Sequence, residues 1–220
     1  MSTTTDRCTI FNQGDFIAIL HQAKFFSHVE ETLQPGWFCV VSDFAENIAF
    51  LARRAIPGFH SNNEQATFSP ITVYFKVNGV LRHYSYCAIS NCLKHDSAVV
   101  YIYQRKLKEL MRIRFGILLR MIYFFDGAPQ QFKNLKSFGN LTHHYSDYGV
   151  EAEWNFFATS HGKGPCHGLA GCIKRNAARA SLQDHLILNA EQLSEWILLS
   201  VSGRLRGNET ISRKRTFPIL

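Results

Sequence analysis

Two short apolar runs in this chain each lead to an aspartate, and this pattern constrains the fold more than any other feature. The first run, residues 37–41, leads through Ser42 to Asp43, and the second, residues 121–125, leads directly to Asp126. Short runs of apolar, β-branched and aromatic residues are typical of buried strands. An ionised carboxylate at the end of such a strand is costly unless a cation compensates it. The pattern therefore predicts two core strands and, if their ends converge, a divalent metal site.

Two converging carboxylates suit chemistry on a phosphodiester. Two oxygen-bound metal ions can hold the attacking and the leaving oxygen of an in-line displacement at the same time. The chain also has a formal net charge of +7 and a pI near 9.2, which favours a polyanionic partner because cationic side chains on phosphates release condensed counterions. We therefore expect Mg²⁺ or Mn²⁺ as cofactor and DNA as partner, rather than a small-molecule substrate.

Composition limits the class of protein. With 220 residues and 46% hydrophobic content the chain can bury one substantial core, and 19% charged residues exclude wholesale disorder. No apolar stretch reaches the roughly 18 residues of a membrane span, and residues 1–6 lack the features of a secretory signal. The six cysteines form no compact disulfide framework. We expect an intracellular protein with reduced thiols, and a nuclear location would follow from DNA chemistry.

Helices and strands alternate along the chain. Apolar residues at helical spacing, together with Pro and Gly signals, predict helices at 15–33, 96–115, after Pro129, from Pro165 to about 181, and near 190–200. In the second of these, basic residues that include Lys108 are interspersed among the apolar ones, and Asp96 or Ser97 is placed to cap it.

Five strand-like runs complete the pattern. They lie at 37–44, 70–77, 80–89, 119–125 and 150–158. Asn78 and Gly79 separate the second run from the third, and both tolerate the positive φ of a type I′ turn, so these two strands form a hairpin. The segment from 48 to 69 lacks either pattern and is expected to be irregular.

Strand, hairpin, helix, strand, helix, strand, helix is the element order of the ribonuclease H-like fold, in which the first and fourth strands are neighbours. We therefore predict an α/β protein with a mixed five-stranded sheet flanked by helices, in which Asp43 and Asp126 meet at one edge of the sheet. The expected organisation is an N-terminal helical segment (1–36), the core (37–182), and a C-terminal helix with a basic tail (183–220). A different α/β sheet built from the same elements stays open.

Three segments of the chain resemble sequence blocks of a known family: DFAEN (43–47), DGAPQQFKN (126–134) and AEWNFFATSHGKGPC (152–166). The family consists of transposon-derived, mostly uncharacterised invertebrate proteins with a ribonuclease H-like core of the DDE transposase kind. The resemblance covers about residues 37 to 182. It implies three acidic metal ligands and DNA strand cleavage or transfer as the ancestral chemistry.

The chain departs from this family pattern at His167, where the resemblance implies an aspartate directly after the Gly-Pro-Cys segment. His167 follows Asp126 by 41 residues (167 − 126), which suits a third ligand at the start of the last core helix. An imidazole in place of a carboxylate removes a negative charge and suits Mn²⁺ better than Mg²⁺. We expect a degenerate site with weakened Mg²⁺ binding. Some ribonuclease H-like nucleases carry histidine at a comparable place, so activity stays open.

Basic side chains follow the expected ligands. On the predicted fold they surround the mouth of the site and contact phosphates without reading bases, or they form an ordinary solvated surface. These residues are Lys133, Lys163, Lys174, Arg175 and Arg179.

Several residues near the expected site have alternative interpretations. Glu46 is either a surface charge or a fourth ligand, and Cys166 beside His167 is either a packed thiol or an activated thiolate. A zinc site would need His161, Cys166, His167 and Cys172, which lack a paired ligand spacing. His143 and His144 are expected on the surface.

Two functional hypotheses remain. The first is a transposase-type catalytic core in which Asp43, Asp126 and His167 hold two divalent ions. The second is a non-catalytic remnant of a transposase that binds nucleic acid or protein. The sequence leaves open whether the chain is an enzyme, which DNA it recognises and its oligomeric state.

Overall fold

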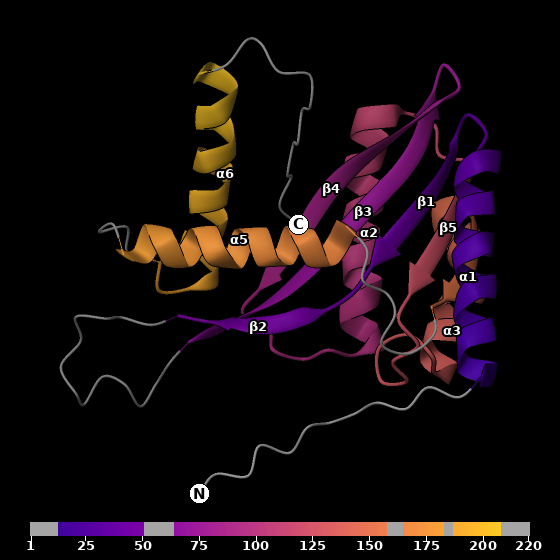
Figure 1. Ribbon diagram of the computed structural model, residues 1–220, viewed down its shortest axis with the longest axis horizontal. Coiled ribbons are helices and arrows are strands. Elements are labelled where there is room, and N and C mark those ends of the chain that lie inside the picture. Colours follow the sequence, from indigo (N-terminus) through magenta and orange to yellow (C-terminus); the bar gives the residue numbers. More distant parts are fainter. Residues whose placement is uncertain (1–12, 51–63, 158–164, 183–186, 208–220) are drawn as a thin grey trace, which may run out of the picture.

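The structure is a computed structural model that describes residues 13–50, 64–157, 165–182 and 187–207 (Figure 1). Helices cover both faces of one mixed sheet. The elements in chain order are α1 (Gln13–Thr32), β1 (Trp37–Ser42), β2 (Ala45–Ala49), β3 (Gln65–Val77), β4 (Val80–Ser90), α2 (Ser97–Phe115), β5 (Arg120–Phe125), α3 (Leu135–Thr142), α4 (His144–Tyr148), β6 (Glu151–Phe156), α5 (Pro165–Leu182) and α6 (Ala190–Gly207).

The sheet has six strands in the order β2-β3-β1-β5-β6, with β4 paired to the other side of β3. β1 is antiparallel to β3 and parallel to β5, and β5 is parallel to β6. The long strand β3 therefore pairs with β4 along one edge and with β1 and β2 along the other. This arrangement places β1 and β5 side by side in the middle of the sheet.

β2 corrects the prediction of five strands and of an irregular segment from 48 to 69. It pairs with the first residues of β3, from Ala45 with Phe68 to Ala49 with Gln65. The sequence of β2, AENIA, is not rich in β-branched or aromatic residues. Its extended form comes from pairing with β3, which is a contact between distant segments that local propensity does not encode.

Two local predictions agree with the structure. Asn78 and Gly79 have φ of 52° and 77°, and Val77 pairs with Val80, as a two-residue hairpin turn requires. The side chain of Asp96 accepts hydrogen bonds from the amides of Ala98 and Val99 and so caps α2.

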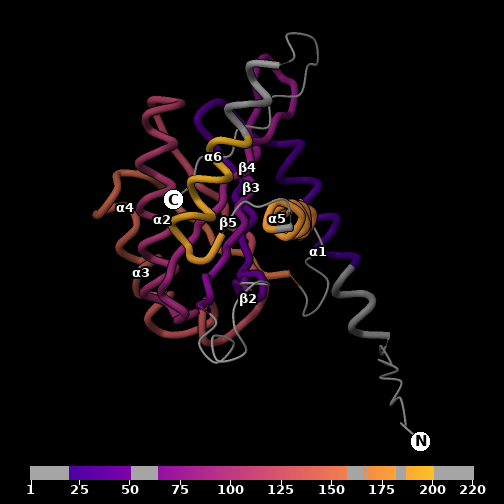
Figure 2. The backbone as a smooth tube through the Cα atoms, turned by 90° about the vertical axis from the view of Figure 1, so that its left-hand side faces the viewer, coloured from indigo at the N-terminus to yellow at the C-terminus, as the bar shows by residue number. Residues whose placement is uncertain are grey.

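The two faces of the sheet bury different clusters. Figure 2 shows α1 and α5 on one side of the sheet, with α2, α3 and α4 on the other. Alternate residues of β1 point to opposite faces, so Val40 belongs to the cluster under α2 whereas Cys39 and Val41 belong to the cluster under α1. The ring of Phe26 in α1 lies 5.0 Å from that of Phe124 in β5, which fixes this helix to the sheet.

The last helix, α6, packs against β4 and α5. Leu193 and Ile197 are buried in a cluster that also contains Ile89 of β4 and Leu169 of α5. None of the described helices is both long and apolar enough to cross a membrane.

Candidate functional site

Parallel pairing of β1 and β5 brings the two aspartates to matching positions. The strands pair in register from Trp37 with Arg120 to Val41 with Phe124, an offset of 83 residues (120 − 37). Continued two residues past the last pair, the same offset sets Asp43 opposite Asp126 (126 − 43 = 83). Both aspartates are half-buried and follow directly on the ends of their strands.

The alternation of side chains assigns both aspartates to the same face of the sheet. Val41 and Phe124 belong to the cluster on the α1 side, together with Cys166 at the start of α5. Asp43 and Asp126 each follow these residues by two positions, so the period of a strand places them on that face too. The two aspartates therefore lie at the carboxyl ends of the two central strands, on the face of the sheet that α1 and α5 cover.

Backbone contacts fix both strand ends. The amide of Asp43 donates to the Pro70 carbonyl (3.4 Å), and Ser69 Oγ donates to the Asp43 carbonyl (2.9 Å), so Asp43 continues the pairing with β3. Oδ1 of Asp126 accepts from the amide of Ala128 at 3.2 Å. This aspartate turn orients the Asp126 carboxyl group as the chain leaves the sheet.

Cys166 anchors the start of α5 beside β1. Its Sγ donates to the Val41 carbonyl (3.3 Å) and lies 3.5 Å from the hydroxyl of Thr72, and the side chain is 1% exposed. α5 begins at Pro165, as predicted, so His167 lies in its first turn. The structure thus brings the backbone of the third predicted position to the neighbourhood of Asp43, while the side chain of His167 is outside the described residues.

Burial also decides the state of the Cys166 thiol. Burial raises its pKa to about 11, and the negative charge of Asp43 raises it as well, while the hydrogen bond from Thr72 acts in the opposite direction. The group is therefore a protonated thiol at neutral pH, which disfavours the activated thiolate considered from the sequence. Its role in the structure is packing at the base of α5.

The basic residues of α5 lie along the helix, at increasing distance from the carboxylates. Lys174 forms a 4.0 Å ion pair with Glu46, whose side chain is 97% exposed, and this geometry identifies Glu46 as a surface charge. Arg175 and Arg179 are exposed. At 1.5 Å of rise per residue they lie about 12 and 18 Å from His167 along the helix axis. They form a basic strip that leads away from the site.

The other two predicted phosphate contacts lie outside this strip. Lys133 is exposed, and its Nζ lies 5.2 Å from the centre of the Phe156 ring at the end of β6. Lys163 is outside the described residues. Of these two residues, the structure therefore places only Lys133, which follows Asp126 by seven residues (133 − 126).

Among the side chains that the structure describes, no three His, Cys, Asp or Glu groups converge on a point that would hold a metal ion. Of the four residues of the zinc alternative, His161 and His167 are outside this set, Cys166 is packed against Val41, and Cys172 accepts from Asn176 Nδ2 at 3.3 Å. Within the described residues, Asp43 and Asp126 therefore have no third ligating side chain beside them.

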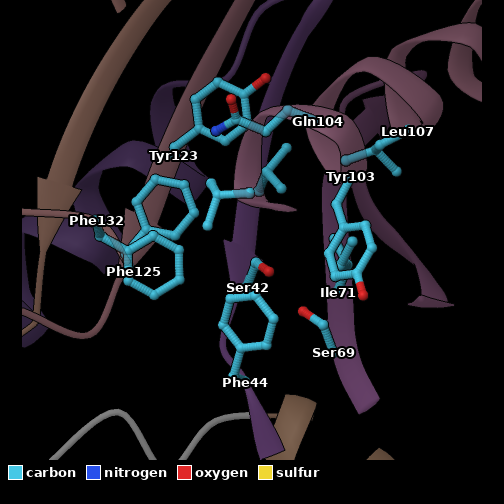
Figure 3. Close-up of a pocket in the computed structure, with 12 residues that line it drawn as sticks. Ser42, Phe44, Ser69, Ile71, Tyr103, Gln104, Leu107, Tyr123, Phe125 and Phe132 are labelled. Carbon is cyan, nitrogen blue, oxygen red and sulfur yellow. The ribbon is translucent and has the colours of Figure 1, made fainter. Parts of the chain in front are cut away.

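A small cavity lies behind the carboxylates, on the α2 face of the sheet (Figure 3). Its volume is about 20 Å³, which is room for about one water molecule. Phe125 and Phe132 stack on one side of it, with ring centres 4.3 Å apart, and Tyr103 lies on the other side. Ser42 and Phe44, the neighbours of Asp43, also line it. The cavity belongs to the packing that supports the two strand ends and is too small for an organic substrate.

Sequence reasoning missed a second group of ionisable residues. His144, expected on the surface, is 3% exposed, and Lys108, one of the basic residues interspersed along α2, is 1% exposed. The spacing of Val100, Gln104 and Lys108 along α2 was the available signal, because residues four apart share one face of a helix.

The chain is similar to a solved transposase structure. Mos1 transposase, in a paired-end complex with the left transposon end, superposes with a TM-score of 0.51 at 10% sequence identity. The match covers 95% of this chain and 60% of that chain. At this identity the likeness shows the fold alone: the molecule has a mixed α/β fold similar to the ribonuclease H-like fold of a transposase. The predicted fold class is confirmed, with six strands in place of five.

The sequence also identifies the family. The chain belongs to the family described as Domain of unknown function (DUF8701), whose model matches residues 22–206. No match was found among curated proteins.

Proposed function

We propose that this chain is a transposase-derived core that binds a divalent cation through Asp43 and Asp126 and is impaired in strand cleavage and transfer because His167 replaces the third carboxylate. The observation that carries the proposal is the shared register of Asp43 and Asp126 at the ends of two parallel strands, on one face of the sheet. The first turn of α5, with His167, begins beside the same strand end.

The donor atoms fit a weakly held, hard cation. Mg²⁺ keeps several waters and is commonly bound through one or two carboxylates together with substrate phosphates, so two aspartates are a sufficient protein contribution. Ala128 holds one oxygen of Asp126 in a fixed direction. Bound ions would supply electrostatic stabilisation of the attacking and leaving oxygens of a phosphodiester. Histidine at the third position shifts the preference toward Mn²⁺.

DNA is the proposed partner. The structural neighbour was solved with a transposon end, and this chain has a formal net charge of +7. Lys174, Arg175 and Arg179 extend from the site along α5, where cationic side chains would contact phosphates without reading bases. We therefore expect DNA binding that weakens steeply as the salt concentration rises.

Calorimetric titration with Mn²⁺ and Mg²⁺ tests the metal site. The wild-type chain should bind Mn²⁺ more tightly than Mg²⁺, and Asp126→Asn should lose at least tenfold in Mn²⁺ affinity. His167→Asp should bind both ions more tightly and gain Mn²⁺-dependent cleavage of a DNA strand. Glu109→Gln, which removes an exposed carboxylate on α2, is the matched control and should bind as the wild type does.

Two outcomes would overturn parts of the proposal. If neither the wild type nor His167→Asp responds to metal, the carboxylate pair is not a metal site. Salt-sensitive DNA binding that persists in Asp126→Asn without any metal response would instead identify a non-catalytic, DNA-binding remnant. Cleavage by the wild type at the rate of His167→Asp would show that the site is not impaired.

A further inference from the structure

α2 carries a lysine into the core of the protein. Lys108 lies on the side of the helix that faces the sheet, in step with Val100, Gln104 and Met111, and is 1% exposed. No carboxylate of the described chain forms an ion pair with it. Because an ammonium group without a counter-charge is costly to bury, its immediate surroundings must explain how it is accommodated.

Two groups of α4 contact the Lys108 amine, and a hydroxyl of β5 contacts one of them. Its Nζ lies 3.1 Å from Nε2 of His144 and 3.4 Å from the centre of the Tyr148 ring, both in α4. The hydroxyl of Tyr123 in β5 lies 3.2 Å from the same Nε2. Lys108, His144 and Tyr123 are buried and Tyr148 is partly exposed, and together these residues join α2, α4 and β5.

The hydrogen bonds determine the tautomer of His144. Its Nδ1 lies 2.8 Å from the carbonyl oxygen of Val150, which only accepts hydrogen bonds, so Nδ1 carries the proton. Nε2 then carries a lone pair, which accepts from the Lys108 amine. The Tyr123 hydroxyl also lies next to Nε2, and its single proton can be donated either to Nε2 or to Met121 Sδ at 3.3 Å. The neutral ring thus ties the residue before β6 to α2 and β5.

Few other charges face this cluster. On α4, Asp147 favours a positive charge, and on α2, Arg112 opposes one and donates to the Tyr148 carbonyl. The Tyr101 ring lies 6.1 Å from that of Tyr148, and the charge of Arg105 also acts on Tyr148. The Asp147 carboxylate and the face of the Tyr148 ring can compensate a positive charge on Lys108, but not a second positive charge on His144.

We propose that Lys108 and His144 form a buried proton switch. It holds α4 and Val150 against α2 and β5 while the pair carries at most one positive charge, and it releases them when both groups are charged. The geometry gives the reason. A proton on Nε2 removes the acceptor for Lys108 and sets an N–H bond against an ammonium group, whereas the Tyr123 hydroxyl can still donate to Met121 Sδ. With both groups charged, the buried contact between α4 and α2 becomes repulsive.

The pKa values agree with this order of protonation. Burial, with the charge of Arg112 acting in the same direction, lowers the pKa of Lys108 to about 7, and Asp147 partly offsets this. Burial and the charge of Lys108 lower the pKa of His144 to about 4, against the opposing effects of Val150 and Asp147. Lys108 therefore takes the first proton near neutral pH, and His144 takes the second in acid.

Nitrogen NMR of the His144 ring and hydrogen exchange of the whole chain, both followed from pH 8 to pH 4, test the switch. As the pH of the wild type falls from 8, the ring should still be the neutral Nδ1–H tautomer at pH 6 and should protonate only at lower pH. As it protonates, the protection factors of the α4 amides should fall at least tenfold while β1 and β5 stay protected. Exchange is compared as protection factors because the intrinsic rate itself depends on pH.

Lys108→Met separates a switch from simple acid unfolding. In this variant the pKa of His144 should rise, yet α4 should stay protected, because the protonated ring then faces the Tyr123 oxygen without an ammonium beside it. Lys106→Met removes an exposed lysine from the same helix and should behave as the wild type.

Three results would overturn the proposal: a wild-type His144 that is already protonated at pH 6, loss of protection in α4 and the central strands together, or α4 opening in Lys108→Met at the wild-type pH. If Lys108→Met does not fold, the ring titration and the exchange pattern of the wild type still decide. None of these measurements depends on metal or DNA binding, so they stand apart from the proposed function.

Discussion

Two groups of ionisable residues, one on each face of this sheet, are accommodated in opposite ways. Asp43 and Asp126 are half-buried at the strand ends on the α1 and α5 face, where an external cation can compensate them. Lys108 and His144 are enclosed on the α2 face, where hydrogen bonds and an aromatic ring must serve instead. The comparison teaches that a half-buried charge at a strand end can be compensated from outside the chain, whereas an enclosed charge can be relieved only by losing or gaining a proton.

The largest expected effect concerns the enclosed pair. The pKa of Lys108 is about 7 in the folded chain, against 10.5 for a lysine that water surrounds, so the unfolded chain binds more protons between these values and stability rises with pH. This contribution should add about 3 kcal/mol to the free energy of unfolding between pH 7 and 9.5. In Lys108→Met it should vanish, which urea denaturation at several pH values will measure.

The difference between Lys108→Met and the wild type isolates this contribution from other groups, such as the buried tyrosines, that also titrate at high pH. Lys106→Met is the control, and its stability should follow the wild-type pH dependence. Equal pH dependence in Lys108→Met and the wild type would mean that the amine is not buried as described, and the contrast between the two regions would fail.

A smaller effect is expected where α5 meets the carboxylates. Cys166→Ala removes the thiol that contacts the Val41 carbonyl and Thr72, and should cost about 1–2 kcal/mol of stability. Because this contact places the first turn of α5 beside Asp43, Mn²⁺ affinity should also fall, although less than in Asp126→Asn. Thermal unfolding and calorimetry measure the two effects.

Cys172→Ala is the matched control for this variant, because Cys172 lies on the same helix and is only partly buried. It should change stability by less than about 0.5 kcal/mol. If Cys166→Ala leaves both stability and Mn²⁺ affinity unchanged, the start of α5 does not organise the site.

The smallest effect is expected at the exposed ion pair beside the basic strip. Glu46→Gln removes the partner of Lys174 and should alter stability by less than about 0.5 kcal/mol. Loss of a negative charge next to the strip should slightly strengthen DNA binding, measured by fluorescence anisotropy at several salt concentrations. The Mn²⁺ affinity of Glu46→Gln should equal that of the wild type. A lower affinity would indicate that Glu46 is a metal ligand after all.

Much of the candidate site was visible in the sequence. The runs that end at Asp43 and Asp126 predicted two strands, and the element order predicted that these strands are neighbours, as the register of β1 and β5 shows. The metal and DNA roles of these residues stay predictions. The direction of α5, which runs past Glu46 of β2, was not visible, because spacing gives the distance of Arg179 from the first turn but not the direction in which the helix runs.

The sequence by itself determined the features that depend on neighbours in the chain: the turn at Asn78 and Gly79, the cap at Asp96 and the start of α5 at Pro165. These follow from local backbone preferences. Only the tertiary structure decided that AENIA is a strand and that Lys108 and His144 are buried. Strand pairing and burial arise from contacts between distant segments, and such contacts can outweigh what composition and propensity favour locally.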